Sequence, residues 1–228
     1  MFEGDLEHYF SVGQSALRCI RLGMLAAGKD HVTSLLDFGC GFGRVLRVLK
    51  LAFPKAELAA CDLSRDAVEF CKAKFGAEPL LSSEHATDVV IDRKFDLIWC
   101  GTLLTNVDAV QFLDFLKLFR SLLLPGGLLV FTTHGPFVVG RLRNGEFSYG
   151  LDRAVVPSLI AGYDEQGFGY ANYPPEVLLR LGVNKYGISI SRPSWVCRQI
   201  EDIGGLQLLT YTEKAWDNHQ DSIACLKC

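Results

Sequence analysis

The sequence predicts an α/β domain in which helices cover both faces of a mostly parallel sheet. Short apolar runs alternate with amphipathic segments along most of the 228 residues, and short connections join them. The apolar runs show little alternation between apolar and polar residues, as expected for strands that are buried on both faces. With 49% hydrophobic residues, the chain can bury one sizeable core. We therefore expect a three-layer sandwich.

The predicted elements follow one another in a regular order. Residues 5–29 have the pattern of a helix that Gly28 ends. Strands are then predicted at 34–38, 57–61, 78–81 and 95–100, alternating with helices at 43–53, from Ser64 onward and at 107–123. Ser64 is the expected N-cap of its helix. The turn Pro125-Gly126-Gly127 leads into a fifth strand at 128–132.

Residues 134–192 interrupt this order. They are rich in glycine, tyrosine and proline, and a long irregular insertion in a compact domain is usually functional or disordered. Because this segment has too many aromatic and aliphatic residues for disorder, we interpret it as a substrate cap. The N-terminal helical segment is then 1–33, and the core comprises 34–133 and 193–228. A helix at 194–203 and two strands, at 206–212 and 222–227, complete the core. A short link joins these strands, so they should pair antiparallel.

A glycine-rich turn is the most informative feature of the chain. The buried strand at 34–38 runs into Asp37-Phe38-Gly39-Cys40-Gly41-Phe42-Gly43-Arg44, and an amphipathic helix follows. A turn without Cβ atoms lets a ligand approach the backbone closely, and ligands bind at the carboxyl ends of strands in open α/β sheets. The fingerprint of dinucleotide-binding folds is G-x-G-x-x-G or A. Counted from Gly39, its third small residue would fall on Arg44, so this turn fits a nicotinamide dinucleotide poorly.

Charge and cysteine content narrow the function classes. A net charge of −3 and a pI near 6.0 give no electrostatic case for nucleic acid or an anionic membrane. The first residues lack a signal-peptide pattern and no apolar run reaches about 18 residues, so we expect a cytoplasmic protein. The eight cysteines include a lone C-x-x-C at 225–228 without a second pair, which favours reduced thiols over a metal site.

Five motifs in order resemble those of the class I S-adenosylmethionine-dependent methyltransferases. They cover residues 35–228 and comprise the D-x-G-x-G-x-G turn, the acid in Ala60-Cys61-Asp62-Leu63-Ser64, the strand and loop at 94–104, the L-x-P-G-G-x-L turn at 122–130, and the closing helix and strand pair. This resemblance implies a seven-stranded, mostly parallel sheet whose last strand is antiparallel. It also implies S-adenosylmethionine as cofactor and S-adenosylhomocysteine as product.

The resemblance also implies which residues hold the cofactor. Asp62 would accept hydrogen bonds from the ribose hydroxyls, for which a carboxylate offers two oxygens; a helix N-cap is the alternative. The segment after the third strand lacks the Asp often found there, and Ser83 or Glu84 stands in its place. The absence of an N-P-P-Y or D-P-P-Y string argues against amino-group methylation in nucleic acid. The expected cofactor-binding residues are Asp37, Gly39, Cys40, Gly41, Gly43, Asp62, Leu63, Ser83, Cys100, Gly101 and Thr102.

Two histidines are candidates for a catalytic base. His134 directly follows the fifth strand, and His219 lies in the link between the last two strands, so both belong to the edge where a parallel sheet binds ligands. Asp217 or Asp221 could orient His219, although a polar turn explains that link equally well. Within the cap, Tyr149 and Tyr163 are candidate substrate contacts, together with Asp217 beside His219, and ordinary packing is the alternative for the tyrosines.

The leading hypothesis is a methyltransferase that acts on a small-molecule acceptor at oxygen. A non-catalytic S-adenosylmethionine-binding module is the second hypothesis, and a nicotinamide-dependent oxidoreductase is the third. The sequence leaves open the acceptor, the methylated atom, the use of a general base, the residue that contacts the adenine, and the oligomeric state.

Overall fold

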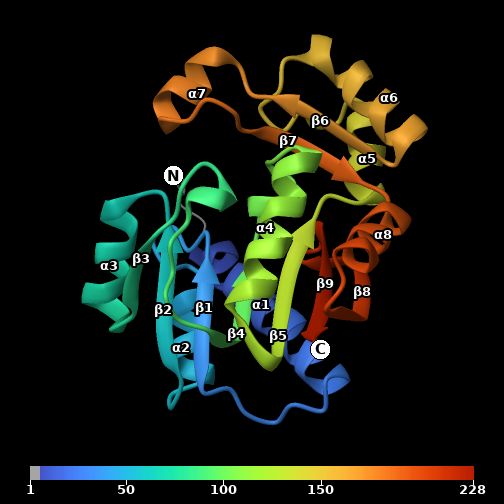
Figure 1. Ribbon diagram of the computed structural model, residues 1–228. Helices are drawn as coiled ribbons and strands as arrows, with labels where there is room; N and C mark the ends of the chain where they lie inside the picture. The colour runs from blue at the N-terminus through green and yellow to red at the C-terminus, as the bar shows by residue number, and fades with distance from the viewer. Residues whose placement is uncertain (1–5) are drawn as a thin grey trace.

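A seven-stranded sheet runs through the middle of the protein, with helices on both faces (Figure 1). The computed structural model describes residues 6–228. The strand order is β3-β2-β1-β4-β5-β9-β8, and β9 is antiparallel to both of its neighbours, which confirms the predicted fold class. The strands are β1 (Ser34–Phe38), β2 (Glu57–Asp62), β3 (Glu78–Leu81), β4 (Phe95–Cys100), β5 (Leu123–Thr133), β8 (Leu206–Trp216) and β9 (Gln220–Lys227).

The helices form the two outer layers. On one face, α1 (Leu6–Ala26), α2 (Leu46–Ala52) and α3 (Arg65–Phe75) bury their apolar residues against the sheet. On the other, α4 (Ala109–Leu122) and α8 (Pro193–Ile203) do the same. Ser64 caps α3, since its side chain accepts a hydrogen bond from the backbone N–H of Ala67. Within residues 6–228, we find no helix with the length and apolar character that crossing a membrane requires.

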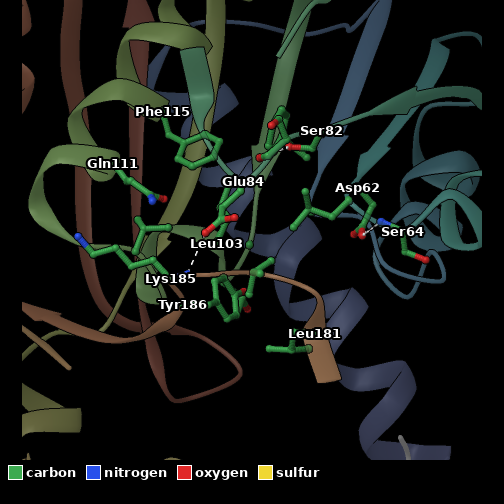
Figure 2. A pocket seen from close by; sticks show the side chains of 18 residues that line it. Asp62, Ser64, Ser82, Glu84, Leu103, Gln111, Phe115, Leu181, Lys185 and Tyr186 are labelled. Atoms are coloured by element: carbon green, nitrogen blue, oxygen red, sulfur yellow. Dashed lines mark hydrogen bonds between the residues drawn. The ribbon is translucent and has the colours of Figure 1, made fainter. Parts of the chain in front are cut away.

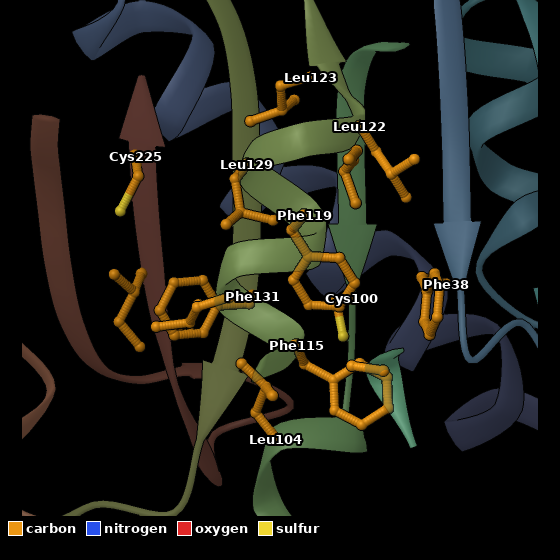
Figure 3. Packing of buried hydrophobic residues seen from close by; sticks show 14 of the residues in the cluster. Phe38, Cys100, Leu104, Phe115, Phe119, Leu122, Leu123, Leu129, Phe131 and Cys225 are labelled. Carbon is orange, nitrogen blue, oxygen red and sulfur yellow. The ribbon is translucent and has the colours of Figure 1, made fainter. Parts of the chain in front are cut away.

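An aromatic cluster fixes the carboxyl end of β1 against α4. Phe38, the last residue of β1, packs edge-on against Phe115 and Phe119 of α4, with ring centroids 5.9 and 5.0 Å apart. All three side chains are buried (Figure 3). Burying each of them contributes roughly 1.5–3 kcal/mol. The cluster therefore holds β1 and α4 together directly beneath the turn that follows β1.

Some element boundaries differ from the prediction. The helix after the glycine turn begins at Leu46 and not at residue 43, because Gly41 and Gly43 have φ values of 48° and 73° that an α-helix cannot contain. Strand β5 begins at Leu123 and not at residue 128. Leu123 pairs with Phe95 and Leu128 with Leu97, so the residues between them, which include Pro125–Gly127, form an irregularity in the pairing with β4. Strand β8 extends to Trp216, beyond the predicted residue 212.

The insertion at 134–192 is regular in structure, which corrects the expectation of an irregular segment. It contains α5 (Pro136–Arg143), α6 (Val156–Gln166), β6 (Phe168–Asn172), α7 (Pro175–Leu181) and β7 (Gly187–Ser191), and β6 pairs antiparallel with β7. The insertion has its own apolar cluster, which includes Val138, Leu159 and Ile190. It lies across the carboxyl ends of the parallel strands (Figure 1). Its two ends meet, because the N–H of Ser191 donates to the carbonyl of His134 at 2.9 Å.

Candidate functional site

A pocket of about 400 Å³ lies between the sheet and the insertion (Figure 2). Such a volume is typical of small-molecule sites. On the sheet side, the carboxyl ends of β1, β2 and β4 and the segments that follow them line it, together with α4. On the other side it is lined by four residues of the insertion that are more than 80 positions away from β4 in sequence: Leu181, Val183, Lys185 and Tyr186.

The glycine turn positions Asp62 in this pocket. The N–H groups of Gly39 and Cys40 both donate to the carbonyl of Cys61, at 2.8 and 3.0 Å, which ties the turn to β2. The N–H of Gly41 donates to Oδ2 of Asp62 at 2.8 Å, and that of Ser64 to Oδ1 at 3.0 Å. Each carboxylate oxygen keeps a further lone pair. Asp62 can therefore accept two more hydrogen bonds from neighbouring hydroxyls.

Asp37 is a buried carboxylate with an unused oxygen. Its side chain is 2% exposed, and Oδ2 has no hydrogen-bond partner within residues 6–228. Burial, and secondarily the charge of Asp62, raises the pKa of Asp37 to about 7. Buried polar atoms are normally hydrogen-bonded. The charge of Arg44 already favours the ionised form, and a cationic ligand group near the glycine turn would favour it further.

The segment after β4 carries backbone strain. Thr102 has a φ of 75°, which is uncommon for a residue with a branched Cβ. Its N–H donates to Oγ1 of Thr132 at 2.9 Å, and the Thr132 hydroxyl in turn donates to Oε1 of Gln220 at 2.7 Å. A Cβ on Gly101 would lie 2.9 Å from the Trp216 ring, so only glycine fits there. Strained residues cluster at functional sites, and both residues line the pocket.

The sequence-predicted cofactor residues fall into two groups. Gly39, Asp62, Leu63, Ser83, Gly101 and Thr102 line the pocket. The other five lie beside or beneath its wall: Asp37, Cys40, Gly41, Gly43 and Cys100. The thiols of Cys40 and Cys100 are buried, and the eight cysteines, all in the described part of the chain, are free. Burial raises the pKa of Cys100 well above its usual value, so this thiol packs as a small apolar group. Individual cofactor contacts stay predictions.

The structure brings together three of the predicted catalytic and substrate residues. The ring centroids of His134 and His219 are 5.6 Å apart, and Tyr149 lies 5.5 Å from the first and 5.4 Å from the second. Nδ1 of His134 lies 3.2 Å from the carbonyl of Ser189. The Tyr149 hydroxyl is buried without a hydrogen-bond partner in the described structure. Burial and the neighbouring His219 lower the pKa of His134 to about 3.

Three other predicted residues lie elsewhere or have other partners. Tyr163 is buried in the apolar cluster of the insertion. Asp217 pairs with Nε2 of His8 at 2.9 Å. Asp221 is fully buried and accepts from the Tyr211 hydroxyl at 2.8 Å and the N–H of Lys214 at 3.0 Å. Neither acid forms a hydrogen bond to His219 within residues 6–228.

Several pocket residues were not singled out from the sequence. Gln111 and Phe115 lie one helical turn apart on α4, and their spacing of four residues is the only sequence signal that they share a face. Leu181 is the last residue of α7, and residues 182–186 follow that helix. No sequence motif distinguishes this segment. We refer to residues 181–186 as the strap. Among the described residues, no group of three or more His, Cys, Asp or Glu side chains is arranged to hold a metal ion.

Glu84 fastens the strap to the core. Its Oε1 accepts from the N–H groups of Asn184 and Lys185, at 2.9 and 2.8 Å, and its Oε2 accepts from the Asn184 side-chain amide at 3.0 Å. Nζ of Lys185 forms an ion pair with Asp108, the N-cap of α4. That pairing and the N-cap bond lower the pKa of Asp108, although burial opposes them. Glu84 therefore holds the strap in place as one wall of the pocket.

Replacing Glu84 by alanine is expected to loosen the strap. Three hydrogen bonds to a carboxylate are lost, and bonds to a charged group contribute up to about 1.5–3 kcal/mol each, less where they are exposed to solvent. Amide hydrogens in residues 181–186 should then exchange at least tenfold faster in a hydrogen–deuterium exchange experiment. Exchange in β4 should stay unchanged. Equal protection of the strap in the variant and the parent would contradict the role given to Glu84.

Comparisons with known proteins agree with this geometry. A family model described as a methyltransferase domain matches residues 36–129. A malonyl-[acyl-carrier protein] O-methyltransferase of Halalkalibacterium halodurans is 28% identical over 114 residues, 47% of this chain and 41% of that protein. N-demethylindolmycin N-methyltransferase of Streptomyces griseus is 26% identical over 55% of this chain and 56% of that protein. The chain thus spans about half the length of the curated relatives it matches.

The solved structures extend the likeness to the whole fold. An S-adenosylmethionine-dependent methyltransferase from Clostridium acetobutylicum superposes with a TM-score of 0.62 at 17% identity, over 94% of this chain and 91% of that one. Fold and pocket together define a Rossmann-like α/β protein with a pocket at the carboxyl ends of its parallel strands, which is where such folds bind ligands. Residues 36–129 thus match a methyltransferase domain, and the whole chain shares the fold of an S-adenosylmethionine-dependent methyltransferase. S-adenosylmethionine is therefore the cofactor to compare with the residues of this pocket.

The residues present fit this cofactor. It carries a ribose diol, an adenine base, and cationic sulfonium and ammonium groups. Asp62 has lone pairs left for two hydroxyls, and the unpartnered Oδ2 of Asp37 suits a cation. The pocket also offers apolar faces, including Leu103, Val107 and Phe115, against which a flat base can pack.

Proposed function

We propose that the protein transfers a methyl group from S-adenosylmethionine to a small-molecule acceptor, at an oxygen atom. The observation that carries this proposal is the grouping of His134, His219 and Tyr149 at the carboxyl edge of the sheet, where the insertion meets the core. An oxygen nucleophile has a proton to lose, and histidine is the usual base near neutral pH. A relative that is an O-methyltransferase supports the same choice.

The insertion supports a small acceptor. In this proposal, residues 134–192 are a substrate cap that excludes water and holds the acceptor in line with the transferred methyl group. Phe137, whose ring centroid is 5.8 Å from His219, and Tyr149 supply apolar faces next to the two histidines. The net charge of −3 provides no broad basic surface for nucleic acid. Bound S-adenosylmethionine would supply the activated methyl group.

His219 is the better base of the two histidines. With its Nδ1 proton directed at the Ser189 carbonyl, His134 presents Nε2 as an acceptor, but its pKa of about 3 makes it a weak base. The pKa of His219 is lowered less, by burial and by Arg141, and Asp217 opposes that effect. The hairpin that holds His219 is anchored, because Nε1 of Trp216 donates to the carbonyl of Val12 at 3.1 Å.

The pH profile distinguishes the two histidines. A base works in its neutral form, so the methylation rate should fall as the pH drops through the lowered pKa of His219, below about 6.5. His134 stays neutral throughout that range and contributes no change. His219→Asn should slow turnover by about 10²–10⁴-fold and remove this acid limb. An unchanged acid limb in His219→Asn would exclude His219 as the base.

Two measurements test the function. Calorimetric titration with S-adenosylmethionine, S-adenosylhomocysteine and NADH should show binding of the first two ligands only. Transfer of a labelled methyl group should then be screened against carboxylic acids and phenols, with amines and ribosomal RNA in parallel. Transfer to an oxygen acceptor would support the proposal. Transfer to amines or RNA alone would overturn the choice of acceptor, and binding without any turnover would favour a non-catalytic module.

A further inference from the structure

We propose that Gln111 recognises the adenine base of the cofactor, at the end of the pocket opposite Asp62. This inference rests on S-adenosylmethionine binding as assigned above, and it names the residue that distinguishes adenine from other bases. Figure 2 shows Gln111 and Asp62 on opposite sides of the pocket. The two ends differ in chemistry, and that difference decides which part of the cofactor each one takes.

The side chain of Gln111 is buried and unpartnered. Gln111 lies in the first turn of α4, and its backbone N–H donates to Oδ1 of Asp108 at 2.9 Å, which fixes its position. The residue is 8% exposed and lines the pocket. Its side-chain amide has no hydrogen-bond partner within the described residues 6–228. The amide is not among the unpartnered polar atoms that are closed off from solvent, so it is accessible from the pocket and available to a ligand.

The surroundings of Gln111 suit a flat nitrogen base. The Gln111 amide lies between Phe115 and Lys185 (Figure 2), and the charge of Lys185 is taken up by Asp108, whereas the other end of the pocket carries the carboxylate of Asp62 and the hydroxyl of Ser64. An amide offers a carbonyl acceptor and an NH₂ donor side by side. Adenine offers a 6-amino donor beside a ring-nitrogen acceptor, and Gln pairs with that edge through two hydrogen bonds. Phe115 lies beside Gln111 (Figure 2), and the pocket is also lined by Leu103, Val107 and Val183.

The other polar groups of the pocket have different partners or positions. Both oxygens of Glu84 accept hydrogen bonds from the strap, and Nζ of Lys185 is paired with Asp108. Ser83 follows Ser82, whose N–H donates to the backbone carbonyl of Asp62 at 3.0 Å. Ser83 therefore belongs to the Asp62 end of the pocket. The Tyr186 hydroxyl also lines the pocket, but its single oxygen cannot offer a separate donor and acceptor side by side, as the Gln111 amide does.

The test compares two ligands by calorimetry: S-adenosylhomocysteine and the same compound with the 6-amino group of its base replaced by hydrogen. The parent protein should bind the amino compound about ten- to a hundredfold more tightly. Gln111→Leu, which keeps the size of the side chain, should reduce that ratio to about one, mainly by weakening S-adenosylhomocysteine. Ser83→Ala should retain the parent ratio, and Gln207→Leu, on the exposed surface of β8, is the control for adding an apolar side chain.

Each outcome decides the proposal. A parent-like ratio in Gln111→Leu, or an unchanged affinity for S-adenosylhomocysteine, would overturn it and leave the cofactor assignment intact. No binding of either ligand by the parent protein would overturn the cofactor assignment as well. Gln111→Asn withdraws the amide by one methylene group without removing its polarity. If Gln111→Leu fails to fold, a collapsed ratio in Gln111→Asn supports the proposal, and an unchanged ratio rejects it.

Discussion

Replacing Asp62 by alanine is expected to weaken S-adenosylhomocysteine binding by more than about a hundredfold. A hydrogen bond to a charged group contributes roughly 1.5–3 kcal/mol, and two ribose hydroxyls would lose such a partner. Each 1.4 kcal/mol corresponds to about a factor of ten. The carboxylate also holds the N–H of Gly41 and of Ser64, so its removal loosens the turn as well. Calorimetric titration of the purified variant measures the loss.

The matched control is Asp66→Ala. Asp66 is an exposed acid in the first turn of α3, four residues from Asp62. Its removal changes the net charge by the same amount and costs at most about 1 kcal/mol of helix-dipole interaction. We expect this variant to bind S-adenosylhomocysteine like the parent. If folded Asp62→Ala also binds like the parent, the nucleoside lies somewhere other than at the end of β2.

Gly43→Ala is expected to lower the free energy of unfolding by about 3 kcal/mol. Its φ of 73° is a left-handed conformation that costs a residue with a Cβ about 1–2 kcal/mol. The added Cβ would also overlap the ring of Phe75 and lie 3.1 Å from Sγ of Cys71. Overpacking of this kind typically costs a further 1–3 kcal/mol. Urea denaturation followed by circular dichroism gives the difference.

Gly41→Ala is the comparison that separates the two causes. Gly41 also has a positive φ, of 48°, but no atom lies within 4 Å of the position of an added Cβ. This variant should therefore lose only the backbone contribution, about 1–2 kcal/mol. Equal losses in both variants would show that contact with Phe75 does not matter, and that backbone strain alone explains the glycine at position 43.

The buried strands were the most predictable part of the fold. The ranges 34–38 and 95–100 match β1 and β4 to the residue, because each apolar run ends at a glycine. The range 78–81 also matches β3, although that edge strand is only partly buried. The start of α2 was missed, since the helical pattern of apolar residues begins before the backbone can leave the glycine turn. The content of 134–192 was missed because α6 and β6 are short, and their order depends on packing within the insertion.

The candidate site was predictable only where local sequence fixes position. Asp62 and the two histidines follow strands, so strand direction brings them to one edge of the sheet. Glu84 and Asn184 are 100 residues apart, and no pattern indicates their contact. Gln111 has the spacing of a helix residue among apolar neighbours. Its place in the pocket depends on the tertiary structure and has no signal in the sequence.

The hydrogen bond between Ser191 and His134 has a consequence for how such proteins diversify. The insertion leaves the core at His134 and returns at Ser191, and these two residues are adjacent. Its length and content can therefore change without altering the order of the seven strands. If residues 134–192 are the substrate cap proposed above, a chimaera that joins this core to the corresponding insertion of a methyltransferase should take on the acceptor preference of that enzyme. Because residues of the strap, 181–186, line the pocket beside Asp62, the grafted insertion would have to contain an equivalent strap.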